Sequence, residues 1–172
     1  MTELHLMLQH LKQPEYIHVL LNPLPVYGLM MGVVALVAAW IARNRAAQAV
    51  ALLIVALAGV SVWPVVEFGE RGFDNVYAIS DRESQQWLDV HATRASRLAP
   101  VFYAVAVLAV VTVFVPWKFP KTNNALLTIT LIAALVALGI GGWIGHAGGQ
   151  VRHSEFRDGP PSKPVPPWTH TD

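Results

Sequence analysis

The most regular feature of the sequence is a series of long apolar runs separated by short charged segments. Four runs contain no Lys, Arg, Asp or Glu: residues 24–42, 46–66, 98–116 and 125–144. A helix of about 20 residues crosses a hydrocarbon core about 30 Å thick, so each run is long enough to span a membrane. None of the runs has the polar stripe of a helix on a soluble protein. The pattern predicts an all-α integral membrane four-helix bundle with up-down-up-down topology.

The segments between the runs predict the orientation of the bundle. The first connection carries Arg43 and Arg45, the last carries Lys118 and Lys121, and neither contains an acid. By the positive-inside rule both connections face the cytoplasm. All 11 acidic residues then lie on the other side, together with both termini. We therefore expect a multi-pass protein of a bacterial inner membrane with periplasmic N- and C-termini, in contact with the lipid bilayer and with no nucleic-acid partner.

The polar parts of the chain predict further elements. Leucines at helical spacing within residues 2–11 indicate a short amphipathic helix on the membrane surface. Charges and histidines within residues 1–21 argue against a cleavable signal peptide. We expect residues 1–157 to form one transmembrane domain and the proline-rich residues 158–172 to form an extended or disordered tail.

The segment between the second and third runs, residues 67–97, is predicted to be a long outer loop that ends in a helix. Ser80 and Glu83 match a capping box, in which Ser80 accepts from the first turn and Glu83 reaches back. The helix is expected to begin there and to continue through His91 and Pro100 into the third run.

Four histidines are predicted to lie at the same outer level of the bundle, although they are far apart in the sequence. They are His18, His91, His146 and His153. The chain has no cysteine, so a histidine cluster is its most obvious means of binding haem or a metal ion. The alternative for each histidine is an interfacial anchor or a hydrogen bond to a neighbouring helix.

Glycines surround two of these histidines. Five glycines lie between Gly141 and Gly149, and each costs a helix about 1 kcal/mol relative to alanine. They either allow close packing of transmembrane helices or clear space for a flat macrocycle beside His146. Both roles are compatible with one another.

Three segments resemble a domain-of-unknown-function family of small four-helix bacterial membrane proteins. They are Asn-Pro-Leu-Pro-Val-Tyr (22–27), Trp-Leu-Asp-Val-His (87–91) and Gly-His-Ala-Gly-Gly-Gln-Val-Arg-His (145–153), and the resemblance covers residues 16–157. Members of that family open with His-Pro-x-x-Val-His. His91 and Gly148-Gly149 match the family pattern, whereas Asn22 and Tyr27 replace its opening histidines. The resemblance implies a bundle similar in layout to b-type cytochromes.

These observations support three hypotheses about function. The first is a b-type haem protein that passes electrons at the outer face of the membrane, within or beside a respiratory assembly. Its preferred axial ligands are His91 and His146, with His18 and His153 as alternates or a second pair, and Arg94 and Arg152 pair with the haem propionates.

The second hypothesis is a non-redox structural or accessory subunit of a membrane complex. The third is a divalent-metal protein in which the same histidines bind Zn or Cu with Asp89 or Glu155. An ion-coupled transporter is less well supported, because the runs lack charged residues. The sequence gives no case for hydrolytic catalysis.

Overall fold

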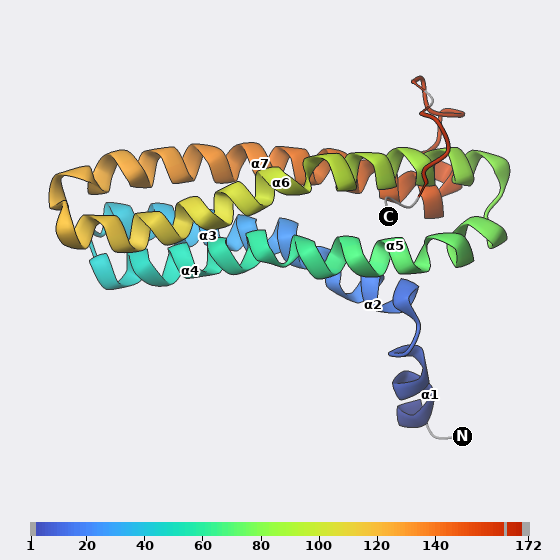
Figure 1. Cartoon of the computed structure of the whole chain (residues 1–172), viewed down its shortest axis with the longest axis horizontal. Coiled ribbons are helices and arrows are strands. Elements are labelled where there is room, and N and C mark those ends of the chain that lie inside the picture. The colour runs from blue at the N-terminus through green and yellow to red at the C-terminus, as the bar shows by residue number, and fades with distance from the viewer. Residues whose placement is uncertain (1–2, 164, 170–172) are drawn as a thin grey trace. The chain divides into compact units, whose positions relative to one another are not determined.

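The computed structural model describes residues 3–163 and 165–169, and in this part of the chain all regular structure is helical (Figure 1). The α-helices are α1 (Glu3–His10), α2 (Pro14–Leu21), α3 (Pro23–Ile41), α4 (Arg45–Val60), α5 (Val62–Ile79), α6 (Arg82–Lys118) and α7 (Asn123–Arg152), and the 3-10 helices are η1 (Pro120–Thr122) and η2 (Ser154–Phe156). The all-α prediction is confirmed.

Within residues 3–163 and 165–169, four helical segments are long and apolar enough to cross a membrane. They are Pro14–Ile41, Arg45–Ile79, Arg82–Lys118 and Pro120–Arg152. Each covers all or nearly all of one predicted apolar run and extends beyond it at one end at least. The chain therefore has the helices of a multi-pass membrane protein, and these helices fit a lipid bilayer.

The chain divides into two compact units. The first, called the span unit here, comprises Pro23–Val62 and Ala99–Gly141. The second, called the histidine unit, comprises Met1–Asn22, Trp63–Leu98 and Gly142–Asp172. Helices α6 and α7 contribute residues to both units.

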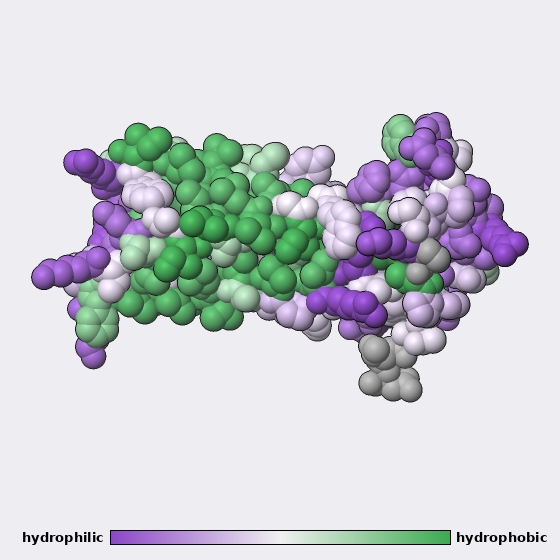
Figure 2. Space-filling model, turned by 90° about the horizontal axis from the view of Figure 1, so that it is seen from above, coloured by the Kyte–Doolittle hydropathy of each residue, from purple (hydrophilic) through white to green (hydrophobic). Residues whose placement is uncertain are grey.

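Small residues bring the helices of the span unit close together. A Cβ atom at Gly32 of α3 would lie 2.7 Å from Cγ2 of Val55 on α4, and one at Gly59 would lie 2.6 Å from the carbonyl oxygen of Phe102 on α6. Close packing of this kind holds helices together in lipid, where the hydrophobic effect does not drive their association. Large apolar side chains cover the outward surface of this unit, as Figure 2 shows.

A buried polar pair joins α6 to α7 in the span unit. Oγ1 of Thr112 lies 2.7 Å from Oγ1 of Thr130, and both residues are buried. Thr112 gives its one hydroxyl proton to the carbonyl oxygen of Leu108. Thr130 is therefore the donor between the helices.

The turn between α3 and α4 is built around Arg43, which has a φ of 52°. The amide of Arg43 donates to the carbonyl oxygen of Trp40, and that of Asn44 donates to Ala39. This is the hydrogen-bond pattern of a Schellman motif, with arginine in the left-handed position that glycine usually occupies. Asn44 then caps α4 by accepting from the amide of Ala47.

The segment after the second apolar run is helical, and the prediction of a long loop from residue 67 was wrong. Helix α5 continues to Ile79, and only Ser80 and Asp81 separate it from α6. A loop was expected because acids and glycines are frequent after residue 66. Their side chains instead lie on a helix with a strong amphipathic pattern, whose apolar face includes the buried Phe73.

The predicted capping box was also wrong in its residues. Asp81, not Ser80, caps α6, since its carboxylate accepts from both the amide and the hydroxyl of Ser84 at 2.8 Å. Ser80 donates to the carbonyl oxygen of Val76 and thus belongs to the end of α5. A carboxylate is the stronger cap because it also complements the positive end of the helix dipole. The predicted continuation of α6 through His91 and Pro100 is confirmed.

The N-terminal residues Glu3–His10 form the predicted short helix, and none of them is buried. Its position on the membrane surface stays a prediction. Residues 158–163 and 165–169 form no helix or strand, and they contact the histidine unit through Gly159 and Trp168.

Candidate functional site

The histidine unit contains two histidines that are held in the same way by neighbouring helices. The first is His18 of α2, whose Nδ1 lies 2.8 Å from the carbonyl oxygen of Val65 on α5. Because a carbonyl oxygen can only accept, Nδ1 carries the proton and donates it. Gly69 follows Val65 by one helical turn, and a Cβ atom there would lie 2.8 Å from this Nδ1. Gly69 thus allows the ring to lie against the backbone of α5.

The second is His91 of α6, which repeats this arrangement on α7. Its Nδ1 donates to the carbonyl oxygen of Ile144 at 3.0 Å, and the residue is only 9% exposed. Gly148 follows Ile144 by one turn, and a Cβ atom there would lie 3.1 Å from Nδ1 and Cε1 of the ring. Each histidine therefore contacts a carbonyl and a glycine four residues apart on a second helix.

The two rings lie next to one another. The ring centroids of His18 and His91 are 6.1 Å apart and the ring planes are at 81°. Within the residues that the structure describes, no hydrogen bond is made by Nε2 of either ring. With Nδ1 protonated, a neutral imidazole keeps its lone pair on Nε2, which is then free to bind a metal.

The separation of the rings suits one metal ion between them. Two opposed metal–imidazole bonds of about 2 Å, with roughly 1 Å from each ring centre to its nitrogen, place two centroids about 6 Å apart. A backbone carbonyl that accepts from the other ring nitrogen is the usual support of a ligating histidine, because it fixes the tautomer and the ring orientation. Each histidine of the pair thus has the backbone contact that supports a ligating imidazole.

His146, the preferred partner of His91 in the sequence analysis, has different surroundings. Its side chain is exposed, and its ring lies edge-on to Trp87 with centroids 6.3 Å apart. His153 follows the last residue of α7, its exposed ring stacks on Phe156, and its Nδ1 donates to the Glu155 carboxylate at 2.9 Å. The ring contact of His91 is thus with His18.

The two candidate arginines also differ. Arg94 follows His91 by one turn of α6, and its guanidinium lies 3.9 Å above the ring of Trp143 while Nη1 donates to the Trp143 carbonyl. These contacts hold the guanidinium beside the histidine pair along α6. Arg152 is exposed at the end of α7.

The described residues do not gather a site made of protein ligands alone. In residues 3–163 and 165–169, no group of three or more His, Asp or Glu side chains is placed to hold one metal ion. Asp89 accepts from the backbone amide of Trp168, and Glu155 pairs with His153. A zinc site needs three or four such ligands, so the third hypothesis gains no support.

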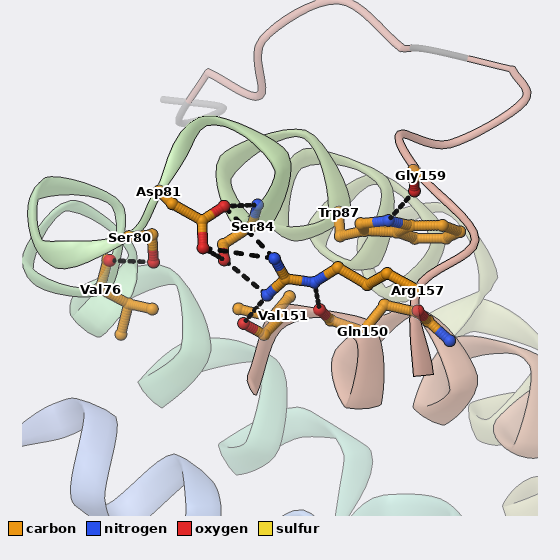
Figure 3. Close-up of polar contacts among 9 residues, drawn as sticks. All are labelled: Val76, Ser80, Asp81, Ser84, Trp87, Gln150, Val151, Arg157 and Gly159. Carbon is orange, nitrogen blue, oxygen red and sulfur yellow. Dashed lines mark hydrogen bonds and ion pairs between the residues drawn. The ribbon is translucent and has the colours of Figure 1, made fainter. Parts of the chain in front are cut away.

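A polar cluster centred on Arg157 was not expected from the sequence (Figure 3). Arg157 comes after η2, and its side chain is only 7% exposed. It donates to the carbonyl oxygens of Gln150 and Val151, to the hydroxyl of Ser84 and to the carboxylate of Asp81. One guanidinium therefore satisfies the last carbonyls of α7 and links them to the capping residue of α6.

Asp81 is held in its charged form by this cluster. The hydrogen bonds from Ser84, with a smaller contribution from Arg157, lower the pKa of the Asp81 carboxyl from 3.8 to about 2. The pKa of Glu155 is also lowered, by hydrogen bonds from its backbone and from His153. Neither acid lies in a long apolar helix, and their role is to fasten the chain after α7.

Gly69 is the site residue that the sequence analysis missed. The signal was present, since Val65 and Gly69 have the same spacing as Ile144 and Gly148. This repeat could be recognised only once each pair was known to face a histidine.

Comparisons with protein-family models, with curated proteins and with solved structures gave no match to this chain.

Proposed function

We propose that this chain is a membrane haem protein in which His18 and His91 are the axial ligands of one b-type haem. The observation that supports the proposal is the matched pair of rings, each with Nδ1–H bound to a backbone carbonyl and the two centroids 6.1 Å apart. Two histidines are enough for such a site, because the porphyrin supplies the other nitrogens. A pure protein metal site would need more ligands than the described residues bring together.

In this proposal the protein residues position the ligands. The carbonyls of Val65 and Ile144 hold each ring in the tautomer that presents Nε2, and they increase the basicity of that nitrogen. Gly69 and Gly148 let both rings approach the helix backbones. The haem iron supplies one-electron redox chemistry between its ferric and ferrous states. The function that follows is electron transfer, within or beside a respiratory assembly.

The orientation proposed from the sequence places this site at the outer face of the inner membrane. The basic turns at Arg43 and Lys121 face the cytoplasm, both termini face the periplasm, and the four spans alternate in direction. We assign Arg94 as the first partner of a haem propionate, because it lies one turn from His91 and is fixed by Trp143. Arg152 is the second. The resemblance to the four-helix membrane family is consistent with this assignment.

The test is the visible spectrum of the purified protein. We expect a Soret band and sharp α and β bands on reduction, with about one haem per chain when the macrocycle is extracted and quantified. The near-perpendicular ring planes also predict a low-spin ferric signal of large anisotropy in electron paramagnetic resonance. A preparation that neither contains haem nor takes it up when haem is added would refute the proposal.

One observation favours a second candidate, a non-redox accessory subunit. Each of the two histidines already joins two helices through a hydrogen bond to a carbonyl, which is a structural role in its own right. For an accessory subunit the Nδ1 hydrogen bonds alone explain the two histidines. Substitution of His18 or His91 by glutamine or asparagine would then preserve much of the stability of the fold. The haem proposal predicts instead that neither amide supports cofactor binding.

A further inference from the structure

The part of the proline-rich tail that the structure describes is hydrogen-bonded to the histidine unit at Gly159 and at Trp168. The indole Nε1 of Trp87 donates to the carbonyl oxygen of Gly159 at 3.2 Å, as Figure 3 shows. Nine residues later, the backbone amide of Trp168 donates to Oδ1 of the buried Asp89 at 2.9 Å. Both acceptor–donor pairs connect the tail to α6.

The second point also includes an aromatic contact. The ring of Trp168 lies 4.8 Å from the ring of Phe73 and packs on the buried cluster formed by Phe73, Leu88 and Val151. Trp168 is thus an anchor that occupies apolar surface of the histidine unit.

Between these anchors the described residues of the tail are mostly exposed. Pro161 is buried, while most of the residues from Ser162 to Pro167 are exposed wherever the structure describes them. Tyr77, Gln85 and Asp89 line a cleft of about 290 Å³ beside Val165 and Pro167. The tail therefore covers this surface with anchors at Gly159 and Trp168, and most of the described residues between them are exposed.

The hydrogen bond from Trp87 to the carbonyl of Gly159 is of the kind that tryptophan-lined grooves make to proline-rich ligands. Domains that bind such peptides use tryptophan N–H groups to bond ligand carbonyls and aromatic rings to contact prolines, and they exploit the preformed extended conformation of the peptide. Here Trp87 and Tyr77 supply the aromatic side chains, and Asp89 supplies an acceptor for the far anchor.

We propose that the surface formed by Phe73, Tyr77, Trp87 and Asp89 is a recognition groove for proline-rich peptide segments, and that the tail of this chain is its resident ligand. The occupant that it accepts in exchange is a segment of a partner polypeptide with prolines followed by an aromatic anchor. A tethered ligand acts at an effective concentration of about 1 mM, so the tail can occupy the groove with little intrinsic affinity. A partner segment that binds more tightly can therefore displace the tail. This inference does not depend on haem binding.

The test uses full-length protein in detergent and a fluorescein-labelled peptide with the sequence of residues 158–169. Binding is followed by fluorescence anisotropy. We expect the peptide to bind the Trp168→Ala protein at least ten times more tightly than the wild type, whose own tail competes. The added exchange Trp87→Phe, which keeps the ring and removes the N–H donor, should reverse most of this gain.

Two controls make the outcome decisive. A peptide of the same composition in scrambled order should not bind, and circular dichroism should show that the variants are folded. If Trp168→Ala lowers the yield of folded protein, the experiment uses Pro161→Ser instead. This substitution weakens the binding of the tail at its buried proline. Equal binding to wild type and to the loosened variant, or equal binding of the scrambled peptide, would overturn the proposal.

Discussion

At the scale of single residues, the candidate site depends on two glycines that touch histidine rings. Gly69 and Gly148 lie against His18 and His91, whereas a Cβ atom at Gly145 or Gly149 would meet nothing within 4 Å. The sequence showed a cluster of glycines near His146 without showing which of them mattered. The rotation of α7 about its axis decides which glycines face His91, and this rotation cannot be read from a single sequence.

This difference gives a matched pair of substitutions. We expect Gly148→Ala to displace the His91 ring, because the new Cβ would lie 3.1 Å from it, and to lower haem occupancy severalfold. Gly149→Ala should leave occupancy unchanged and add up to about 1 kcal/mol of stability from helix propensity. The haem-to-protein absorbance ratio measures the first effect and thermal unfolding the second. Equal occupancy in the two variants would argue against the ring contact.

The assignment of ligands shows what the sequence could and could not predict at this scale. All four histidines were identified as candidates, and the structure pairs His91 with His18 by ring contact. The sequence analysis preferred His146 because sequential helices usually pack together. His18 was ranked lower because a residue before the first apolar run can be a solvated loop side chain, whereas α2 and α3 are separated only by Asn22, which is itself in a helical conformation.

At the scale of elements, the start of α6 and the end of α7 are joined by Asp81 and Arg157. The folded pKa of Asp81, about 2, lies below its ordinary value of 3.8. A depressed carboxyl contributes stability above its unfolded pKa and loses it as the pH falls towards the folded pKa. The contribution is therefore complete near pH 5 and is lost between about pH 4 and pH 2.

The pH prediction can be checked against Asp81→Asn. Thermal unfolding followed by circular dichroism should show the wild type more stable than the variant at pH 5, with a difference that shrinks as the pH approaches 2. A difference that stays constant over this range would show that the charge of Asp81 is not what stabilises the junction. The side chain is 63% exposed, so the effect is expected to be modest and to weaken in high salt.

In the span unit, the pair Thr112–Thr130 offers a second test of an element contact. Thr130→Val removes the donor between α6 and α7, and interhelical hydrogen bonds of this kind are worth about 0.6 kcal/mol on average in membrane proteins. A double-mutant cycle with Thr112→Val should return a coupling of that size. The control is Thr128→Val, because exposed Thr128 donates only within its own helix, to Asn124. Zero coupling would contradict the contact.

At the scale of the whole molecule, the apolar pattern was the most reliable signal. Four spans were predicted from four charge-free runs, and the described part of the chain has four long apolar helices. The apolar pattern did not show that α5 continues to Ile79, because residues 67–79 are polar enough to resemble a loop, whereas the extension of α6 was predicted from the helix start near Ser80. Packing of an amphipathic face, rather than hydropathy, makes residues 67–79 helical.

The proposed orientation can be tested because the sequence contains no cysteine. Single cysteines introduced as Glu83→Cys and Lys121→Cys, both at exposed positions, should react differently with a membrane-impermeant maleimide added to intact cells. We expect labelling at position 83 alone, since position 121 is in a basic connection without acids. Labelling of position 121 in intact cells would reverse the orientation and place the histidine pair at the cytoplasmic face.

The central claim is that His18 and His91 together hold a haem, and the most direct measurement is haem content in single histidine variants. The wild type, His18→Ala, His91→Ala, His146→Ala and His153→Ala would be purified in parallel, and the reduced-minus-oxidised spectrum recorded at equal protein concentration. We predict loss of most haem in the first two variants, because each removes one axial ligand, and near-wild-type content in the last two, whose rings lie against Trp87 and Phe156. Full haem content in His18→Ala, or loss of haem in His146→Ala but not in His18→Ala, would contradict the account.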